Sequence, residues 1–330
     1  MRAPGFWWRE PGAAAALLSP AARVYGVIAE RRLKKRGERV GVPVVCIGDP
    51  TVGGAGKTPT AIAVMRLLIE ARRRPMFLTR GFGGTLRGPV MVEASHTAAQ
   101  VGDEPLLLAR VAPTIVARDR VAGARFAAEK GAGFIVMDDG FQNPSLVKDL
   151  SVLVVDGARG IGNGRVIPAG PLRAPFHAQL NRAQLLLVLG KVTGASPIIL
   201  AAQQREFPLV RATLEPDRKA VDLLRGKRVL AFAGIGHPAK FFATLAAAGI
   251  ETPSCRAFPD HHRYRASEAA ALITAATSGG LQLVTTEKDF VRLKDDPALA
   301  QLAAQSLAVP ISLGRSDEFD RLMRGALASR

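Results

Sequence analysis

The sequence contains little cysteine and few aromatic residues. Two cysteines, Cys46 and Cys255, occur in 330 residues, and neither is part of a Cys-x-x-Cys spacing. The sequence therefore predicts neither a disulfide framework nor a structural zinc site. Aromatic residues make up 5% of the chain and are not interleaved with Arg or Lys. This pattern argues against the stacking platform of a single-strand nucleic-acid-binding protein.

A long hydrophobic run is also missing. The apolar stretch 13–18 is rich in alanine and is followed by Pro20 and Arg23, whereas a membrane-spanning helix needs about 20 apolar residues. The stretch is too short for a signal peptide as well, and Glu10 lies just before it. We therefore expect no spanning helix, and we expect the mature protein to keep this segment.

Residues 1–40 nevertheless have a distinctive pattern. Trp7 and Trp8 precede the alanine-rich stretch, and the basic run 31–36 follows it. Indole rings and basic side chains are typical of helices that lie in the headgroup region of a membrane. A helix packed on the protein core is the alternative that these residues leave open.

Positive charge is in excess. The chain has 45 Lys and Arg against 28 Asp and Glu, which gives a formal net charge of +17. Such a balance predicts a polyanionic partner, and nucleic acid, anionic lipid and nucleotide all satisfy it. Hydrophobic residues make up 48% of the chain, which is typical of a globular protein. The length favours about two domains.

From residue 42 onward, short apolar runs alternate with helical stretches. This alternation is typical of a doubly wound parallel sheet with helices on both faces, so we expect an α/β fold. The expected strands are 42–48, 76–79, 114–117, 134–137, 151–155 and 185–189, and the expected helices are 59–73, 104–111 and 120–130.

A second alternating set begins near residue 228. Its expected strands are 229–233 and 282–285, and its expected helices are 238–248, 267–277 and 317–327. The stretch 207–226, which contains two prolines and ends on a glycine, is the expected connection. We therefore predict a membrane-associating helix at 1–40, a core at 41–215 and a smaller C-terminal α/β domain at 216–330.

A glycine-rich segment follows the first expected strand of the core. It reads Thr51-Val52-Gly53-Gly54-Ala55-Gly56-Lys57-Thr58 and precedes a helix that Pro59 opens. The backbone N–H groups of such a loop bind nucleotide phosphates, the lysine reaches the β and γ oxygens, and the threonine hydroxyl can ligate Mg²⁺. Thr51 departs from the glycine that usually opens the motif. We predict a P-loop NTPase-like core that binds ATP through residues 51–58.

Two adjacent carboxylates follow another apolar strand. Asp138 and Asp139 come directly after Phe134–Met137. In P-loop proteins a neighbouring strand delivers an aspartate that holds Mg²⁺ beside the phosphates. Two adjacent carboxylates would repel each other without a cation nearby, so we interpret the pair as Mg²⁺ ligands rather than as a turn cap.

Two further stretches are candidates for the acceptor site. Asp103 and Glu104 lie at the entry to an expected helix, where they also fit a cap and a first-turn position. Asp260, His261 and His262 are adjacent in the second domain, where a carboxylate and histidines can tune a base or bind a metal. The residues alone do not decide between these roles.

Seven motifs occur together in one order. Their residues are Gly53-Gly54-Ala55-Gly56-Lys57-Thr58-Pro59, Thr79-Arg80-Gly81-Phe82-Gly83-Gly84, Gly102-Asp103-Glu104-Pro105, Asp138-Asp139-Gly140-Phe141-Gln142, Ile167-Pro168-Ala169-Gly170-Pro171-Leu172-Arg173, Phe258-Pro259-Asp260-His261-His262 and Thr285-Thr286-Glu287-Lys288-Asp289. The ordered series covers nearly the whole chain. It resembles the tetraacyldisaccharide 4'-kinase family, the lipid A 4'-kinases of Gram-negative bacteria.

The resemblance implies an activity and a place in the cell. It implies that ATP and a tetraacylated disaccharide 1-phosphate, a lipid A precursor, give the 1,4'-bisphosphate in a cleft between two domains. It also implies an N-terminal helix that docks at the cytoplasmic face of the inner membrane. No obligate protein partner is indicated. An enzyme for a soluble substrate and a basic nucleic-acid-binding ATPase are the alternatives that a P-loop alone leaves open.

The resemblance also assigns residues to roles. It implies that Asp103 is the base that activates the sugar hydroxyl, with His261 as its partner and His262 as the alternative. From the residues themselves, we expect Lys57 to stabilise the transferred phosphoryl group and Glu104 to join Thr58, Asp138 and Asp139 around Mg²⁺. A guanidinium matches phosphate oxygens bidentately, so Arg80 and Arg173 are candidates for substrate binding, together with His262.

Overall fold

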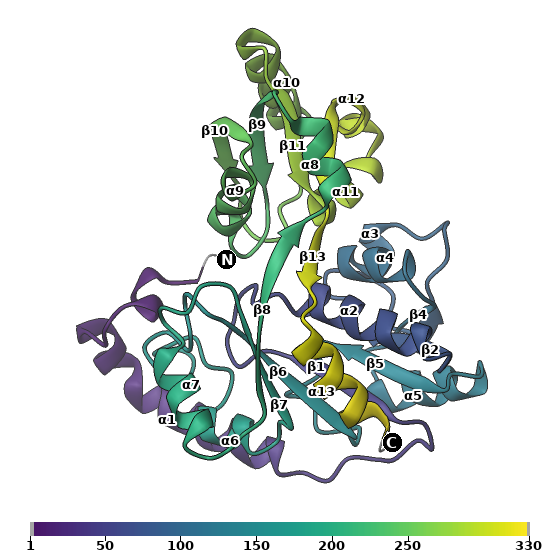
Figure 1. The fold of residues 1–330 in the computed structure, drawn as a ribbon, viewed down its shortest axis with the longest axis vertical. Coiled ribbons are helices and arrows are strands. Elements are labelled where there is room, and N and C mark those ends of the chain that lie inside the picture. The colour runs from purple at the N-terminus through teal and green to yellow at the C-terminus, as the bar shows by residue number, and fades with distance from the viewer. Residues whose placement is uncertain (1–2, 329–330) are drawn as a thin grey trace.

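Apolar strands that are buried on both faces form the centre of the large lobe. The computed structural model describes residues 3–328, and within them nine strands form one sheet in the order β13-β8-β7-β6-β1-β5-β2-β4-β3 (Figure 1). The pairs are parallel except at the two edges, where β3 and β13 are antiparallel to their neighbours. The strands are β1 (Val44–Gly48), β2 (Pro75–Thr79), β3 (Val90–Met91), β4 (Thr114–Val116), β5 (Phe134–Asp138), β6 (Leu150–Asp156), β7 (Leu185–Leu189), β8 (Leu209–Pro216) and β13 (Ile311–Gly314). This parallel sheet confirms the predicted α/β class.

Helices cover both faces of this sheet. Alternate residues of β1 face opposite sides: Val45 and Ile47 pack toward α2 and α13, whereas Val44 and Cys46 pack toward α5 and α7. The large-lobe helices are α1 (Ala13–Leu33), α2 (Lys57–Glu70), α3 (Ala98–Val101), α4 (Asp103–Ala109), α5 (Arg120–Glu129), α6 (Phe176–Leu180), α7 (Ser196–Gln203) and α13 (Asp317–Ala328), with a 3₁₀ turn at Gly5–Trp8.

The small lobe has its own parallel sheet. Within the described range its four strands follow the order β10-β9-β11-β12. The strands are β9 (Arg228–Ala233), β10 (Glu251–Ala257), β11 (Gln282–Thr286) and β12 (Ser306–Val309), and the helices are α8 (Arg218–Leu224), α9 (Pro238–Ala247), α10 (Ala266–Gly279), α11 (Glu287–Lys294) and α12 (Ala300–Gln305), with a 3₁₀ turn at Pro297–Leu299. The lobes are joined by β8 and β13, which run side by side between them (Figure 1).

The connection is structured, and the C-terminus differs from the sequence-based prediction. The expected connection 207–226 contains β8 of the large sheet, which is one of the two strands that join the lobes, and helix α8. Residues 311–328, which we had assigned with the small domain, return to the large lobe as β13 and α13. The reason is the stripe Phe319, Met323 and Leu327, which the large core buries. Such a stripe needs an apolar partner surface, and the large sheet supplies one.

The N-terminal helix packs on the large lobe through its small residues. Ala15, Ala22 and Gly26 are buried, and the opposite stripe, Leu17, Val24 and Ile28, is 59–81% exposed. Each exposed residue of this stripe follows a buried one by two positions, which is about 200° of helix rotation. The two stripes therefore lie on opposite faces of α1. Among residues 3–328, no helix is long and apolar enough to cross a membrane.

The two tryptophans are engaged with the protein rather than free. Trp7 is 8% exposed and its Nε1–H donates to the Pro168 carbonyl at 3.0 Å. The Arg159 guanidinium lies 4.7 Å from the centre of the Trp8 ring. The expectation that the tryptophans lead the contact with a membrane is therefore wrong for Trp7, because its ring fills a site on the core. The most exposed large hydrophobic side chains of α1, Leu17, Val24, Val27 and Ile28, are aliphatic instead.

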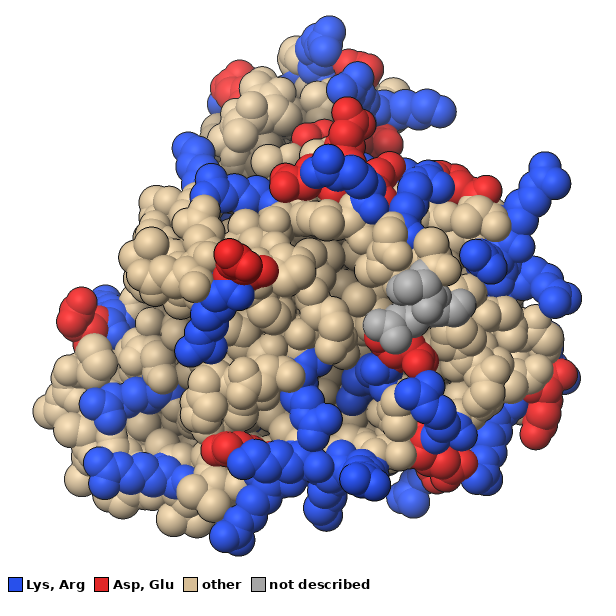
Figure 2. Space-filling model, turned by 60° about the horizontal axis from the view of Figure 1, so that its bottom comes forward, with Lys and Arg blue, Asp and Glu red and all other residues tan. Residues whose placement is uncertain are grey.

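The excess positive charge is scattered on one face of the molecule. On the face in Figure 2, Lys and Arg side chains are scattered around a broad area of uncharged residues, with fewer acidic side chains between them. A protein that tracks a nucleic-acid backbone usually concentrates its basic residues in one stripe or groove. This face favours a general attraction to an anionic surface instead.

Candidate active site

The segment between β1 and α2 forms the predicted phosphate-binding loop. β1 ends at Gly48 and α2 begins at Lys57. Gly56 has φ 97°, and a Cβ at this position would lie 2.6 Å from Cδ1 of Leu189, so glycine is required for two reasons. The chain therefore turns sharply into the N-terminus of α2. Backbone N–H groups that lack a helical partner point out there and suit a phosphate.

Lys57 lies in a network of charges around the buried carboxylate of Asp49. Its Nζ is 2.7 Å from Oδ2 of Asp49 and 3.6 Å from Oδ1 of Asp139. Nε of Arg173 is 3.3 Å from Oδ1 of Asp49 and donates to the Thr51 carbonyl at 3.0 Å. Burial by itself lowers the pKa of Lys57, but the two carboxylates outweigh burial and raise that pKa above its usual value. Lys57 is therefore a permanent cation beneath the loop.

Asp138 and Thr58 form a second polar pair beside the loop. The hydroxyl of Thr58 donates to Oδ2 of Asp138 at 3.0 Å, whereas Oδ1 of Asp138 is buried and accepts no hydrogen bond from any described residue. Burial raises the pKa of Asp138 to about 6. An orphaned buried oxygen costs about 1–3 kcal/mol. A hydroxyl beside a carboxylate with a free oxygen fits Mg²⁺, which prefers hard oxygen ligands.

Asp139 turns away from this pair toward the cations. Its φ is 58°, and its Oδ1 lies 3.6 Å from Nζ of Lys57 and 3.7 Å from Nη1 of Arg173. Burial opposes ionisation of Asp139, but Lys57 and Arg173 lower its pKa below the usual value. The proposed Mg²⁺ ligands Asp138 and Asp139 therefore have different partners in this structure.

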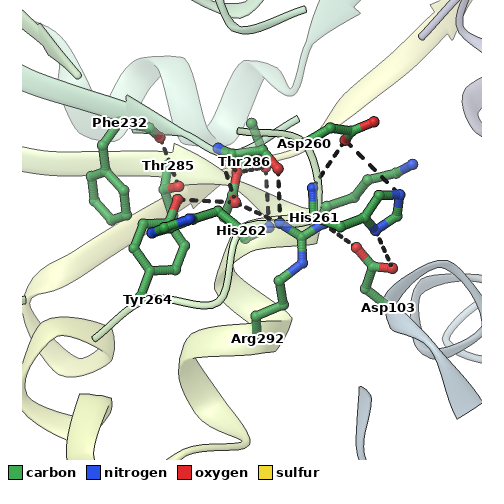
Figure 3. Close-up of polar contacts among 12 residues, drawn as sticks. Asp103, Phe232, Asp260, His261, His262, Tyr264, Thr285, Thr286 and Arg292 are labelled. Atoms are coloured by element: carbon green, nitrogen blue, oxygen red, sulfur yellow. Dashed lines mark hydrogen bonds and ion pairs between the residues drawn. The ribbon is translucent and has the colours of Figure 1, made fainter. Parts of the chain in front are cut away.

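The two lobes meet at Asp103, the first residue of α4. Oδ1 of Asp103 lies 3.3 Å from Nδ1 of His261, which comes from the small lobe (Figure 3). Oδ2 of Asp103 pairs with Nη2 of Arg292 on α11. Burial opposes ionisation of Asp103, but His261 and Arg292 outweigh it and hold its pKa well below the usual value. The hydrogen bond to Asp103 in turn raises the pKa of His261.

Glu104 makes a parallel contact between the lobes. Its Oε1 lies 2.7 Å from Nζ of Lys288 on α11 and 4.0 Å from Nε2 of His261. Ligand atoms of Asp103, Glu104 and His261 all lie within 4.8 Å of one another, which is close enough to share a cation. The structure therefore places Glu104 beside Asp103 and His261, the candidate acceptor-site residues. Its predicted role as a Mg²⁺ ligand stays a prediction.

A cavity of about 1450 Å³ connects these groups. It is lined by the loop 52–58, by Arg80, Glu104, Asp138, Asp139 and Arg173 of the large lobe, and by His261 and Lys288 of the small lobe. Asp103 is 4% exposed and is not among the described residues that line the cavity, so His261 lies between Asp103 and the open space. His262 lies within the small lobe, where Nε2 is 2.9 Å from Glu268 and the ring stacks on Phe258.

Comparison with known proteins shows which family this chain matches. Residues 14–328 match the family described as tetraacyldisaccharide-1-P 4'-kinase, LpxK. The chain belongs to this family. Two proteins named tetraacyldisaccharide 4'-kinase, from Methylobacterium sp. (strain 4-46) and Rhodopseudomonas palustris (strain BisA53), are 54% and 51% identical to it. These alignments cover 100% and 96% of this chain and 98% and 93% of the relatives.

A solved structure of the same family shares the fold. LpxK from Aquifex aeolicus, crystallised in complex with ATP, superposes with a TM-score of 0.69 and 24% sequence identity. The match covers 94% of this chain and 99% of that one. The likeness confirms the α/β fold.

Three charged residues of this kinase were missed in the sequence. Asp49 follows the first strand directly, and its 0% exposure identifies it as the buried partner of Lys57. Lys288 and Arg292 lie on one helix that begins at the Thr285–Asp289 motif. That motif marks the start of the helix in the sequence, but the residues of α4 with which Lys288 and Arg292 pair are far away along the chain. Only the contact between the lobes reveals them.

Replacing Asp138 with asparagine should stabilise the Mg²⁺-free kinase at pH 8 while abolishing its activity. The raised pKa of Asp138 means that the folded state holds this proton more tightly than the unfolded state does. Ionised Asp138 therefore destabilises the folded state as the pH rises from about 4 through about 6. Above this range the free energy of unfolding is lower by about 3 kcal/mol. Urea unfolding at pH 4 and pH 8, without divalent metal, checks this. An equal effect of the substitution at both pH values would contradict it.

Proposed function

We propose that this chain transfers the γ-phosphate of ATP to the 4'-hydroxyl of a tetraacylated glucosamine disaccharide 1-phosphate, a precursor of lipid A. The observation that carries the proposal is the position of His261. It lines the same cavity as the phosphate-binding loop and is backed by the buried carboxylate of Asp103. Nucleotide phosphates and a proton acceptor therefore share one space, as transfer to a hydroxyl requires.

The loop and Lys57 hold the phosphates in this proposal. Backbone N–H groups of residues 53–58 bind the phosphate oxygens, and Lys57 balances the charge that spreads over the transferred group. Thr58 and Asp138 would hold Mg²⁺, with Asp139 and Glu104 as the further predicted ligands. When bound, that ion neutralises phosphate charge. Arg80 and Arg173 line the same cavity and offer guanidinium groups to anionic oxygens.

Asp103 and His261 remove the hydroxyl proton. The oxygen of the acceptor forms its bond to the γ-phosphorus as the bond between that phosphorus and the bridging oxygen of ADP breaks. The acceptor proton passes to the Asp103–His261 pair, in which Asp103 is the proposed base and His261 the partner that faces the cavity. Because the two residues come from different lobes, the pair exists only when the lobes are together. This limits hydrolysis of ATP in the absence of lipid.

Incubation with γ-labelled ATP and the disaccharide 1-phosphate in detergent micelles tests the function. We expect label in the lipid fraction, dependent on both lipid and Mg²⁺. Label that appears only as inorganic phosphate, at a rate that lipid does not change, would refute the lipid kinase and favour an ATPase. A phosphorylated water-soluble acceptor in a cell extract would favour the enzyme for a soluble substrate.

We also propose that α1 holds the kinase at the cytoplasmic face of the inner membrane. The acceptor headgroup stays at the bilayer surface because its acyl chains are buried in the membrane. The exposed stripe Leu17, Val24 and Ile28 can enter the headgroup boundary, and the basic run 31–36 that follows can pair with lipid phosphates. The small residues on the opposite side of α1 fix this orientation, because they pack on the large lobe.

Replacing Leu17, Val24 and Ile28 together with glutamine should weaken binding to anionic vesicles by about tenfold or more. The apparent KM for lipid should rise, while binding of ATP stays unchanged because the loop is untouched. Co-sedimentation at low and high salt measures the effect. Leu223→Gln is the matched control, since Leu223 is 59% exposed on the small lobe. Equal sedimentation of the triple variant and this control would contradict the anchor.

A further inference from the structure

The charged helix α11 carries a residue whose position the proposed chemistry does not yet explain. Arg292 is a partly buried arginine of the small lobe, and three acceptors surround its guanidinium (Figure 3). Nη2 pairs with Oδ2 of Asp103 on the large lobe. Nη1 donates to Oδ1 of Asp289 at 2.8 Å and to the Gly234 carbonyl at 2.9 Å. One side chain therefore links three separate segments.

The Gly234 carbonyl connects Arg292 to the second member of the pair. The backbone N–H of His261 donates to this same carbonyl at 3.1 Å. His261 has φ 54°, a left-handed backbone conformation that a non-glycine residue adopts only when its surroundings hold it. Arg292 thus contacts the side chain of Asp103 directly. It also binds the carbonyl oxygen that accepts the backbone N–H of His261.

A fully buried carboxylate fixes Arg292 in turn. Asp289 is 0% exposed and accepts hydrogen bonds from Gly234 N–H at 3.0 Å, from the Tyr264 hydroxyl at 3.0 Å and from the Thr286 hydroxyl at 2.6 Å. A carboxylate that accepts this many hydrogen bonds is held in one orientation. It therefore also restricts the orientation of the guanidinium bound to it. The network therefore holds Arg292 from within the small lobe.

We propose that Arg292 is a positioning residue that aligns the Asp103–His261 pair for proton removal. It holds Oδ2 of Asp103, so that Oδ1 faces Nδ1 of His261, and it holds the carbonyl on which the His261 backbone rests. The proposal rests on the proposed function and adds to it a residue that does not touch the substrate. Arg292 differs in this respect from Lys288, which lines the cavity beside Glu104.

Replacing Arg292 with methionine should lower kcat about a hundredfold, as a small misplacement of a catalytic pair can do. The KM for ATP should change by less than about threefold, because the loop lies on the other lobe. Arg292→Lys should recover part of the loss, since an ammonium can reach Asp103 but cannot span all three acceptors. Lys294→Ala is the matched control, because Lys294 is a neighbouring cation on α11 that lies over the Phe290 ring instead.

Two further measurements separate positioning from a general loss of structure. Added guanidinium should restore part of the turnover of Arg292→Ala, because it can refill the vacated site, and it should not restore Asp103→Asn. In a double-mutant cycle, Arg292→Met should add little to the loss caused by Asp103→Asn, because the two residues act as one unit. Turnover of Arg292→Met within about threefold of wild type would overturn the proposal. The proposal would also be overturned if Arg292→Met lowered turnover by the same factor in the wild-type and the Asp103→Asn backgrounds.

A readout without lipid distinguishes failure of this proposal from failure of the proposed function. Hydrogen exchange in residues 258–264 should be faster in Arg292→Met than in Lys294→Ala, because the carbonyl that holds the His261 N–H has lost a support. If wild-type protein transfers no label to lipid while this exchange increases, the proposed function fails, although Arg292 still supports the backbone of His261. If wild-type protein transfers label and exchange is unchanged in Arg292→Met, the positioning role fails.

Discussion

Replacing Lys57 with methionine is expected to reduce transfer about a thousandfold or more, because the negative charge of the transition state loses its main side-chain cation. The structure supports a dedicated role for this side chain. Its ammonium is held by Asp49 at 2.7 Å at the end of the loop, and the carboxylates around it raise its pKa. Initial rates at saturating ATP and lipid give the measurement. Turnover above about a tenth of the wild-type value would refute the assignment.

The same substitution leaves a buried carboxylate without its main partner. Asp49 would then depend on Arg173 alone, whose Nε is 3.3 Å away. An uncompensated buried charge destabilises a fold by about 3–5 kcal/mol, so Lys57→Met alone could lose activity by unfolding. Adding Asp49→Asn removes that charge, and it should restore the melting temperature without restoring turnover. Recovery of turnover in the double variant would mean that Lys57 is structural. Lys130→Met, at the surface end of α5, is the control.

Replacing Asp103 with asparagine is expected to lower kcat by about a hundredfold to ten-thousandfold, the range that a general base contributes. Asparagine keeps the shape of the side chain but cannot accept the proton. The affinity for ATP should be retained, because Asp103 is buried behind His261 and does not line the cavity with the described loop residues. Single-turnover kinetics and equilibrium binding of ATP separate the two effects.

Two comparisons sharpen this prediction. Asp222→Asn, at an exposed site on α8, removes a carboxylate that pairs with Arg225, and it should leave turnover unchanged. His261→Gln should lower kcat by a similar amount to Asp103→Asn, and the double variant should lose little more, since the pair acts as a unit. Loss of ATP binding with normal turnover at saturation would place Asp103 in the nucleotide site instead.

The boundaries of the lobes show where sequence patterns stop being informative. The strands buried on both faces are continuous apolar runs, so the pattern predicted the large sheet and the doubly wound class correctly. The stretch 207–226 has prolines and polar residues, and the pattern indicated a linker. Its strand β8 is the penultimate strand of the large sheet. The partner of β8 on its outer side is β13, which comes from the end of the chain, and no local pattern encodes a pairing over that separation.

Some residues of the candidate site are likewise predictable from local sequence patterns, and others are not. The loop 51–58 is predictable because its chemistry is local: glycines with free backbone, one lysine and one threonine must be adjacent to cradle a phosphate. Asp138 is predictable because it ends a strand next to the loop strand. Asp103 and His261 were assigned through resemblance to a family, since their own neighbours fit a helix start and a turn equally well.

Patterns along the chain therefore established the class of fold and the family and predicted the nucleotide site, because periodicity, glycine conformation and ordered motifs are properties of neighbours along the chain. Tertiary structure decided which charges meet. It paired Asp49 with Lys57, brought Arg292 and His261 onto the two oxygens of Asp103, and turned His262 toward Glu268. The physical reason is that burial makes a charge depend on partners within a few ångströms. Packing of the two lobes, rather than spacing in the sequence, sets those distances.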